Sequence, residues 1–161
     1  MKTYIINPDN NKPVPIEDWR KDENPTRAQL LAVETDDGHL LVLSKSYLPG
    51  LHKFDEAQKT AADFKPLEGV IFRCPTRKEC IDLYDARFLG GLDEAVKLTG
   101  GDYGRKGKWF WTCERDADPA YASNAWYSNG TGGICSGVAM YDSNLALPVA
   151  LLTTSEASLK P

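Results

Sequence analysis

The sequence predicts a single α+β domain in which an antiparallel sheet is combined with a few helices. Two apolar runs, at 29–35 and 39–45, flank an Asp-Asp-Gly turn. Residues with helical periodicity follow at 54–64 and 76–89, and the last third of the chain returns to short aromatic and β-branched runs. A hairpin, then helices, then further strands is an order typical of α+β domains.

The N-terminal part begins with a predicted strand at 3–6, followed by a polar segment that contains four prolines. We expect residues 1–27 to form an arm packed on the domain, and residues 28–161 to form the domain itself. The turn Asp36-Asp37-Gly38 joins the two apolar runs, and Asp-Gly between such runs is a strong hairpin signal.

The first predicted helix covers about 54–64. Phe54, Ala57, Ala61 and Phe64 recur at helical spacing, so they are expected to form one apolar face. Acidic residues in the first turn suit the positive end of the helix dipole. Lys65-Pro66 ends the helix, because the residue before a proline is biased toward extended conformations.

The second predicted helix begins after Thr76 and ends before Gly90. Thr76 and Glu79 have the spacing of a capping box, in which each side chain accepts a backbone N–H of the other residue. Glycine pairs end this helix and a shorter third one at about 92–98. The buried face of the second helix is expected to include Cys80, Leu83, Tyr84 and Arg87, with Ile81 and Phe88 beside them.

Four short strands are predicted in the last third, at 109–113, 125–128, 137–141 and 146–152. The links between 113 and 145 are rich in Gly, Ser, Asn and Asp, which is turn and loop chemistry. Trp109 and Trp111 alternate along one strand, so they share a face and are expected in the core.

The charge and the hydrophobic pattern of the sequence argue against two kinds of partner, nucleic acid and the membrane interior. The net charge is −4 and the pI is about 5.2, which argues against nucleic acid as the partner. No run reaches the ~18 apolar residues of a membrane span, so no membrane insertion is expected. The first residues lack the apolar core of a signal peptide, which favours a cytoplasmic or particle-associated protein unless a signal has been removed.

Neither a metal site nor a cofactor is predicted. The four cysteines form no CxxC pair and the chain has only two histidines, which argues against zinc. Cys113 and Cys135 could close the loop between them, but without an export signal we expect reduced thiols. Glu114, Asp116 and Asp118 are spaced as a solvated acidic turn, without the spacing of an EF-hand.

Six segments occur in an order that resembles a known family. The matching segments are 38–43, 54–57 (Phe-Asp-Glu-Ala), 73–79 (Arg-Cys-Pro-Thr and Glu79), 109–112 (Trp-Phe-Trp-Thr), 125–126 (Ala-Trp) and 147–149 (Leu-Pro-Val). Together they resemble the bacterial fib-succ-major (major paralogous) and Lcl C-terminal domains of the C-type-lectin-like superfamily. Two departures stand out: Leu147 replaces a frequent arginine, and 113–116 replace a Ser-rich turn.

The resemblance implies a C-type-lectin-like fold: a twisted antiparallel sheet, two flanking helices and long loops on one side. That side often binds glycans or proteins in the superfamily. We therefore expect a non-enzymatic recognition module that binds a glycan or protein ligand through the 113–145 loops, since aromatic rings and polar tips suit such ligands. The candidate residues are Arg115, Asp116, Tyr121, Trp126, Tyr127, Asn129, Tyr141 and Asn144.

Two other readings remain open. The proline-bearing arm could dock on a neighbour, as in a structural subunit of a surface or phage-like particle, and a homo-oligomer would fit that role. The 73–79 motif also resembles formylglycine-generating enzymes, with Cys113 and Cys135 as a cysteine pair. The chain is short for that family and lacks its Gly-Phe-Arg closing element. His39 and His52 lie in turns without a matching nucleophile, so no catalytic residue is predicted.

Overall fold

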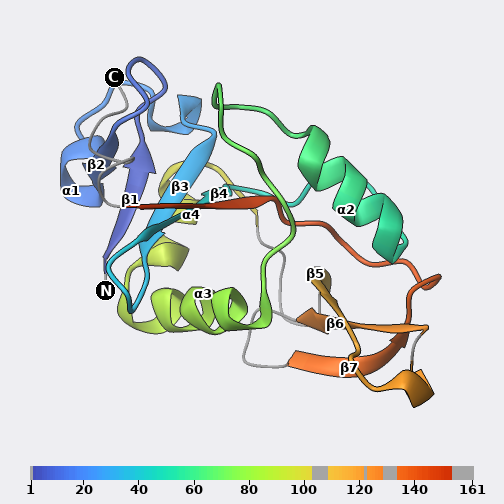
Figure 1. Ribbon diagram of the computed structural model, residues 1–161. Coiled ribbons are helices and arrows are strands. Elements are labelled where there is room, and N and C mark those ends of the chain that lie inside the picture. The colour runs from blue at the N-terminus through green and yellow to red at the C-terminus, as the bar shows by residue number, and fades with distance from the viewer. Residues whose placement is uncertain (1, 103–108, 122, 129–133, 154–161) are drawn as a thin grey trace.

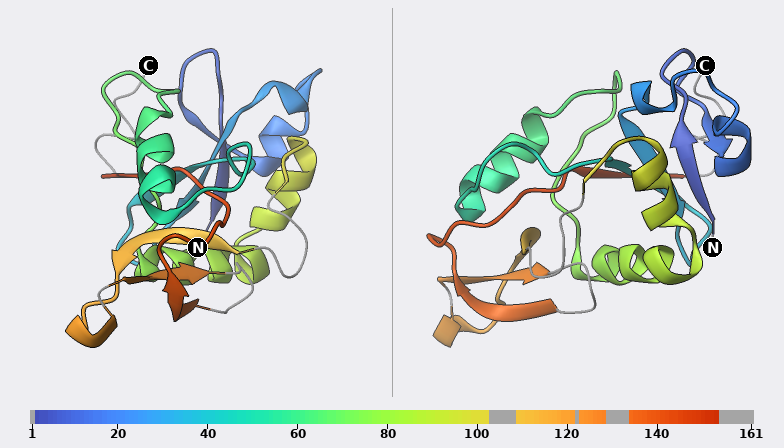
Figure 2. Two further views of the ribbon diagram at one scale, coloured as in Figure 1. Left: turned by 90° about the vertical axis from the view of Figure 1, so that its right-hand side faces the viewer. Right: turned by 180° about the vertical axis from the view of Figure 1, so that it is seen from behind.

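The computed structural model describes residues 2–102, 109–121, 123–128 and 134–153. At residues 121 and 134–138 it describes the backbone alone. Within this part of the chain the fold is α+β, with two antiparallel sheets and several helices (Figure 1). The larger sheet has the strand order β2-β1-β3-β4-β8, and the smaller one has the order β5-β6-β7. The smaller sheet lies below the level of the larger one in every view (Figure 2).

The larger sheet is built around the predicted hairpin. Strands β3 (Leu30–Glu34) and β4 (Leu40–Ser44) pair antiparallel, so the hairpin across Asp36–Gly38 is confirmed. β1 (Thr3–Ile6) adds to β3, and β8 (Val149–Leu152) adds to β4. The short β2 (Pro13–Pro15) forms the outer edge, where prolines are tolerated because they donate no ladder hydrogen bond.

Both faces of this sheet are buried. On one face Leu31, Val33, Leu41 and Leu43 pack in a cluster that also holds residues of the helices. On the other face, alternate residues such as Ala32 and Val42 pack with Leu67 and Phe72 of the segment between the helices. Burial on both sides explains why β3 and β4 read as continuous apolar runs rather than alternating ones.

The N-terminal segment belongs to the sheet and its core. β1 lies between β2 and β3, and Ile5 is fully buried. The short helix α1 (Ile16–Trp19), which the sequence did not predict, buries Ile16 and Trp19 in the same cluster. The indole Nε1 of Trp19 donates to the carbonyl of Pro25, at the start of the 3₁₀ turn η1 (Pro25–Arg27).

The three predicted helices are present as α2 (Phe54–Asp63), α3 (Arg77–Leu89) and α4 (Leu92–Leu98). The capping box at the start of α3 is confirmed: Thr76 Oγ1 accepts the Glu79 N–H, and the Glu79 carboxylate accepts the Thr76 N–H. None of these helices is long and apolar enough to cross a membrane, and the same holds for α1.

The predicted buried face of α3 needs one correction. Ile81 and Phe88 were expected beside the core, but they are 51% and 64% exposed. The buried residues are Glu79, Cys80, Asp82, Leu83 and Ala86. Residues 81 and 88 are seven positions apart and therefore share a face, which points away from this buried set.

The smaller sheet contains β5 (Phe110–Arg115), β6 (Asn124–Ser128) and β7 (Ile134–Ala139). A third cluster, which contains Phe54, Ala57 and Trp111, packs α2 against this sheet. Trp111 is fully buried, as predicted, and its Nε1 donates to the carbonyl of His52 at 2.8 Å. Trp109 is only half-buried and stacks on Tyr127 with the ring centroids 4.2 Å apart.

Candidate ligand-binding groove

The start of α2 is joined to the chain that follows β7. His52 and Asn144 exchange backbone hydrogen bonds of 2.7 and 2.9 Å, and the Phe54 N–H donates to the carbonyl of Met140 at 2.8 Å. The segment from 140 to 146 therefore runs beside α2, as Figure 1 shows. This pairing brings together residues about ninety positions apart in the sequence.

A groove of about 510 Å³ lies at this junction. It is lined by Lys53, Asp55, Glu56, Ser123, Met140 and Tyr141. Tyr141 is 71% exposed, so its ring is free to contact a ligand. The groove thus combines an exposed aromatic face and a thioether with two carboxylates, an ammonium group and a hydroxyl.

Arg115 forms an ion pair with Asp55, one of the residues that line the groove. Its Nη2 lies 3.2 Å from Asp55 Oδ1, and its guanidinium lies 5.7 Å from the centre of the Phe54 ring. Arg115 is exposed and ends β5, so the ion pair connects the smaller sheet to α2. Arg115 and Tyr141 are the two predicted ligand-binding residues that the structure brings to the groove.

Asp116 and Asp118, the acidic residues after β5, accept hydrogen bonds from backbone N–H groups nearby in the sequence. Asp116 Oδ1 accepts the Asp118 N–H at 3.0 Å, and Asp118 Oδ1 accepts the Ala120 N–H at 3.0 Å, which are Asx turns. Glu114 accepts both the backbone N–H and Nε of Arg77. In the described part of the chain no three potential metal-ligating side chains converge.

Trp126 and Tyr127, neighbours on β6, have different surroundings. The Trp126 ring lies under the guanidinium of Arg77, with 4.2 Å between the charge centre and the ring centroid. Tyr127 stacks on Trp109 and also contacts Trp111 at a centroid distance of 6.2 Å. Both side chains are half-buried, and neither lines the groove. The Trp126 ring therefore joins the smaller sheet to α3, whereas the Tyr127 ring packs against the rings of Trp109 and Trp111.

The remaining predicted residues contribute less to the groove. Asn144 is half-buried, and its Nδ2 is buried without a hydrogen-bond partner among the described residues. The backbone of Tyr121 ends the 3₁₀ turn η2 (Pro119–Tyr121), but its side chain lies outside the described part. Asn129 lies wholly outside the described residues.

Three cysteines are free thiols: Cys74 and Cys80 are buried, and Cys113 is half-buried. Burial raises the pKa of Cys74 and of Cys80 to about 12. Burial also raises the pKa of Cys113, although Arg73 acts in the opposite direction. These thiols are therefore protonated at neutral pH, whereas a nucleophilic cysteine needs its thiolate form. The Cys135 side chain is outside the described part.

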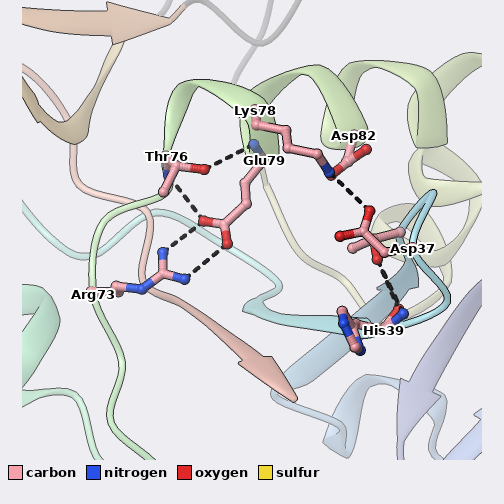
Figure 3. Close-up of polar contacts among 8 residues, drawn as sticks. Asp37, His39, Arg73, Thr76, Lys78, Glu79 and Asp82 are labelled. Carbon is pink, nitrogen blue, oxygen red and sulfur yellow. Dashed lines mark hydrogen bonds and ion pairs between the residues drawn. The ribbon is translucent and has the colours of Figure 1, made fainter. Parts of the chain in front are cut away.

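A separate polar network joins the β3–β4 turn to α3 (Figure 3). Lys78 Nζ lies 3.1 Å from Asp37 Oδ1 and 3.4 Å from Asp82 Oδ2. Asp82 is almost fully buried, and this burial raises its pKa despite the nearby ammonium of Lys78. His39 lies close to Asp37 in the turn, and its Nδ1 is buried and has no hydrogen-bond partner in the part of the chain that the structure describes. The network ties the hairpin to the helix.

Comparison with family models and with curated proteins finds no match to this chain. The groove is therefore assigned on geometry alone. Sequence reasoning missed most of its lining: Asp55 and Glu56 were interpreted as first-turn residues that suit the helix dipole and as part of the 54–57 resemblance, and nothing in the sequence indicated Lys53, Ser123 or Met140. The exposed Tyr141 was the one groove-lining residue that its type and loop position indicated.

Proposed function

We propose that this protein is a non-enzymatic recognition module that binds a glycan through the groove between α2 and the segment after β7. The observation that carries the proposal is the exposed ring of Tyr141 beside the carboxylates of Asp55 and Glu56. An aromatic face stacks on the apolar side of a sugar ring, while carboxylates accept hydrogen bonds from its hydroxyls. The volume of about 510 Å³ is in the range of small-ligand sites.

The rigidity of the groove supports the same function. Ser123 O accepts the Met140 N–H at 2.9 Å, and the His52–Asn144 pairing lies directly beside it. The Arg115–Asp55 ion pair adds a side-chain connection across the same junction. When several elements already hold a binding site in place, few of its groups lose conformational freedom as the ligand binds. The entropic cost of binding is therefore lower.

We further infer that the fold is of the C-type-lectin-like type. Support comes from β4, which precedes α2 and α3, and β8, which follows the smaller sheet: the two strands pair in register from Leu40↔Leu152 to Leu43↔Val149. The chain between them leaves the larger sheet and returns to it, and its described part contains the three helices α2, α3 and α4 and a three-stranded sheet. The antiparallel sheet and its flanking helices support this inference, although the second, three-stranded sheet is an addition to the single sheet that the resemblance implies.

The first experiment is a glycan-array screen of the purified protein, with and without calcium. Hits are then measured by isothermal titration calorimetry against wild type and Tyr141→Ala. Loss of the stacking ring should weaken binding by about tenfold, which corresponds to about 1.4 kcal/mol. Asp55→Asn should also weaken binding, because it alters a groove carboxylate and the Arg115 ion pair.

The matched control is Phe88→Ala, which removes an exposed aromatic ring on α3 that does not line the groove. Its affinity should equal that of wild type. Equal loss in both variants would mean that exposed rings bind glycans without selectivity, and the groove would not be the site. No saturable binding on the array, followed by capture of a protein ligand that needs Tyr141, would change the ligand class to protein.

A second candidate function is that of an assembly subunit. Ile81, Phe88 and Leu89 are three large apolar side chains exposed on α3, and Leu89 is 80% exposed. Tyr84 packs against Phe88, with ring centroids 4.8 Å apart. Large apolar side chains exposed on one helix can mark a protein interface when they form a patch. Light scattering of wild type and Phe88→Ser tests it: a concentration-dependent oligomer lost in the variant would favour assembly.

A further inference from the structure

The β3–β4 turn and α3 share a single ammonium group. Lys78 Nζ lies 3.1 Å from Asp37 Oδ1 in the turn and 3.4 Å from Asp82 Oδ2, which is one helical turn further along α3 (Figure 3). We call this arrangement of Asp37, Lys78 and Asp82 the Lys78 bridge. None of its three residues lines the groove.

The two carboxylates of the Lys78 bridge have different surroundings. The Asp82 side chain is 2% exposed, whereas the Asp37 side chain is 55% exposed. Burial raises the pKa of Asp82, and the negative charges of Asp36 and Asp37 add to this effect, so that together they outweigh the nearby ammonium group. The hydrogen bond from Lys78 instead lowers the pKa of Asp37. Acidification therefore protonates Asp82 first and leaves Asp37 ionised.

A proton on Asp82 changes the forces on Lys78. An ammonium group between two carboxylates is attracted to both, and the two carboxylates repel each other. When Asp82 is neutral, the repulsion disappears and the charge of Lys78 is attracted to Asp37 alone. The Lys78 side chain is 61% exposed and has a flexible stem, so it can move from the 3.4 Å contact toward Asp37.

From this geometry we propose that proton binding to Asp82 strengthens the connection between the β3–β4 turn and α3. With Asp82 ionised, the ammonium group of Lys78 is shared between Asp82 and Asp37. With Asp82 protonated, the ammonium group pairs with Asp37 alone. The connection weakens again only when Asp37 is itself protonated at lower pH. This inference is independent of the glycan groove, so either proposal stands or fails without the other.

Two other ionisable groups of the turn must be separated from this effect. Asp36 also repels the carboxylate of Asp82, but in the described part of the chain it forms no ion pair with Lys78. Replacing Asp36 therefore removes a negative charge without changing the partner of Lys78. His39 lies close to Asp37, so the acid titrations are made in a His39→Gln background, in which no charge can form at this position.

The first test is a ¹³C NMR titration of the Asp82 carboxyl carbon. Asp37→Asn should lower the midpoint of this titration, because Lys78 then pairs with Asp82 alone and a repelling charge is lost. Lys78→Gln should raise the midpoint. Asp36→Asn should lower it less than Asp37→Asn does, since only the repelling charge is lost. Asp63→Asn removes an exposed aspartate paired with Lys59 and should leave the midpoint unchanged.

The second test measures the strength of the connection at pH 7. Double-mutant cycles of Asp37→Asn and Lys78→Gln, followed by urea unfolding, give the coupling between the two residues. Asp82→Asn serves as an uncharged mimic of the protonated residue. In this variant the coupling should change the unfolding equilibrium constant by about twofold more than in wild type. Equal or smaller coupling in the variant would overturn the proposal. So would an Asp82 midpoint that Asp37→Asn lowers no more than Asp36→Asn does.

Discussion

Arg73 donates two hydrogen bonds to the carboxylate of Glu79, at 2.6 and 2.8 Å. The backbone of Arg73 also exchanges hydrogen bonds with Val149 of β8, at 2.9 and 2.7 Å. One residue thus connects the edge of the larger sheet to the first turn of α3. Burial acts to raise the pKa of Glu79, but the hydrogen bonds from Arg73 and Thr76 outweigh burial, and the pKa is lowered.

Arg73→Ala should destabilise the protein by about 2–3 kcal/mol, because it leaves a buried carboxylate without its charged partner. This loss of stability should be smaller than for a fully buried ion pair, since the Arg73 side chain is 37% exposed. Urea unfolding followed by circular dichroism measures the loss. Lys59→Ala breaks the exposed Lys59–Asp63 pair and should reduce stability much less, because solvent screens exposed ion pairs. Equal losses would contradict the structural role of Arg73.

Asp82→Asn should stabilise the protein at neutral pH. Burial raises the folded-state pKa of Asp82 above the ordinary value of 3.8, so the folded protein holds this proton more tightly than the unfolded chain does. At pH values above the folded-state pKa, the ionised carboxylate lowers the free energy of unfolding. This loss disappears as the pH falls through the folded-state pKa toward 3.8, the ordinary value. Unfolding free energies of both proteins from pH 7 to pH 4 measure this difference.

The variant should be the more stable protein at pH 7, and the two curves should converge on acidification. A variant less stable than wild type at pH 7 would show that the Lys78–Asp82 ion pair outweighs burial. Asp37→Asn is the matched control. Its carboxylate is exposed and its pKa is lowered by Lys78, so the substitution should weaken stability slightly at neutral pH.

Gly101→Ala should destabilise the protein by about 3 kcal/mol. A Cβ at this position would overlap the carbonyl oxygen of Lys45 and lie 2.9 Å from the Lys45 Cβ, so the backbone after α4 or after β4 would have to move. Gly69→Ala is a useful comparison. Gly69 has a φ of 74° but open space around it, so alanine should cost only about 1 kcal/mol of backbone strain. Thermal unfolding would show the difference as a larger fall in Tm for Gly101→Ala.

Local patterns in the sequence predicted the elements that depend on local physics. The Asp36–Gly38 turn and the Thr76–Glu79 capping box each lie within a few residues, and the structure has both. α1 was missed because it is only four residues long and follows a proline. This helix is stabilised by the burial of Ile16 and Trp19 in the core, and no local sequence pattern indicates that burial.

The groove could not be predicted because long-range pairing forms it. Lys53 and Asp55 meet Met140 and Tyr141 only after His52 and Asn144 have paired across the molecule. The exposed face of α3 was misjudged for a similar reason. Apolar residues lie all around this helix, and only the packing of Leu83 and Ala86 against the sheet determines that Phe88 faces solvent.

The described thiols should be unreactive in the native protein. Cys74 and Cys80 are buried with a pKa of about 12, and Cys113 is half-buried with a raised pKa. Because the thiolate is the reacting species, Ellman's reagent at pH 7.5 should find no fast-reacting group in a Cys135→Ser background, and three groups after denaturation. Cys113→Ser in the same background is the control. A fast thiol that disappears in this control would show that Cys113 is activated, which would favour the cysteine-dependent enzyme over the recognition module.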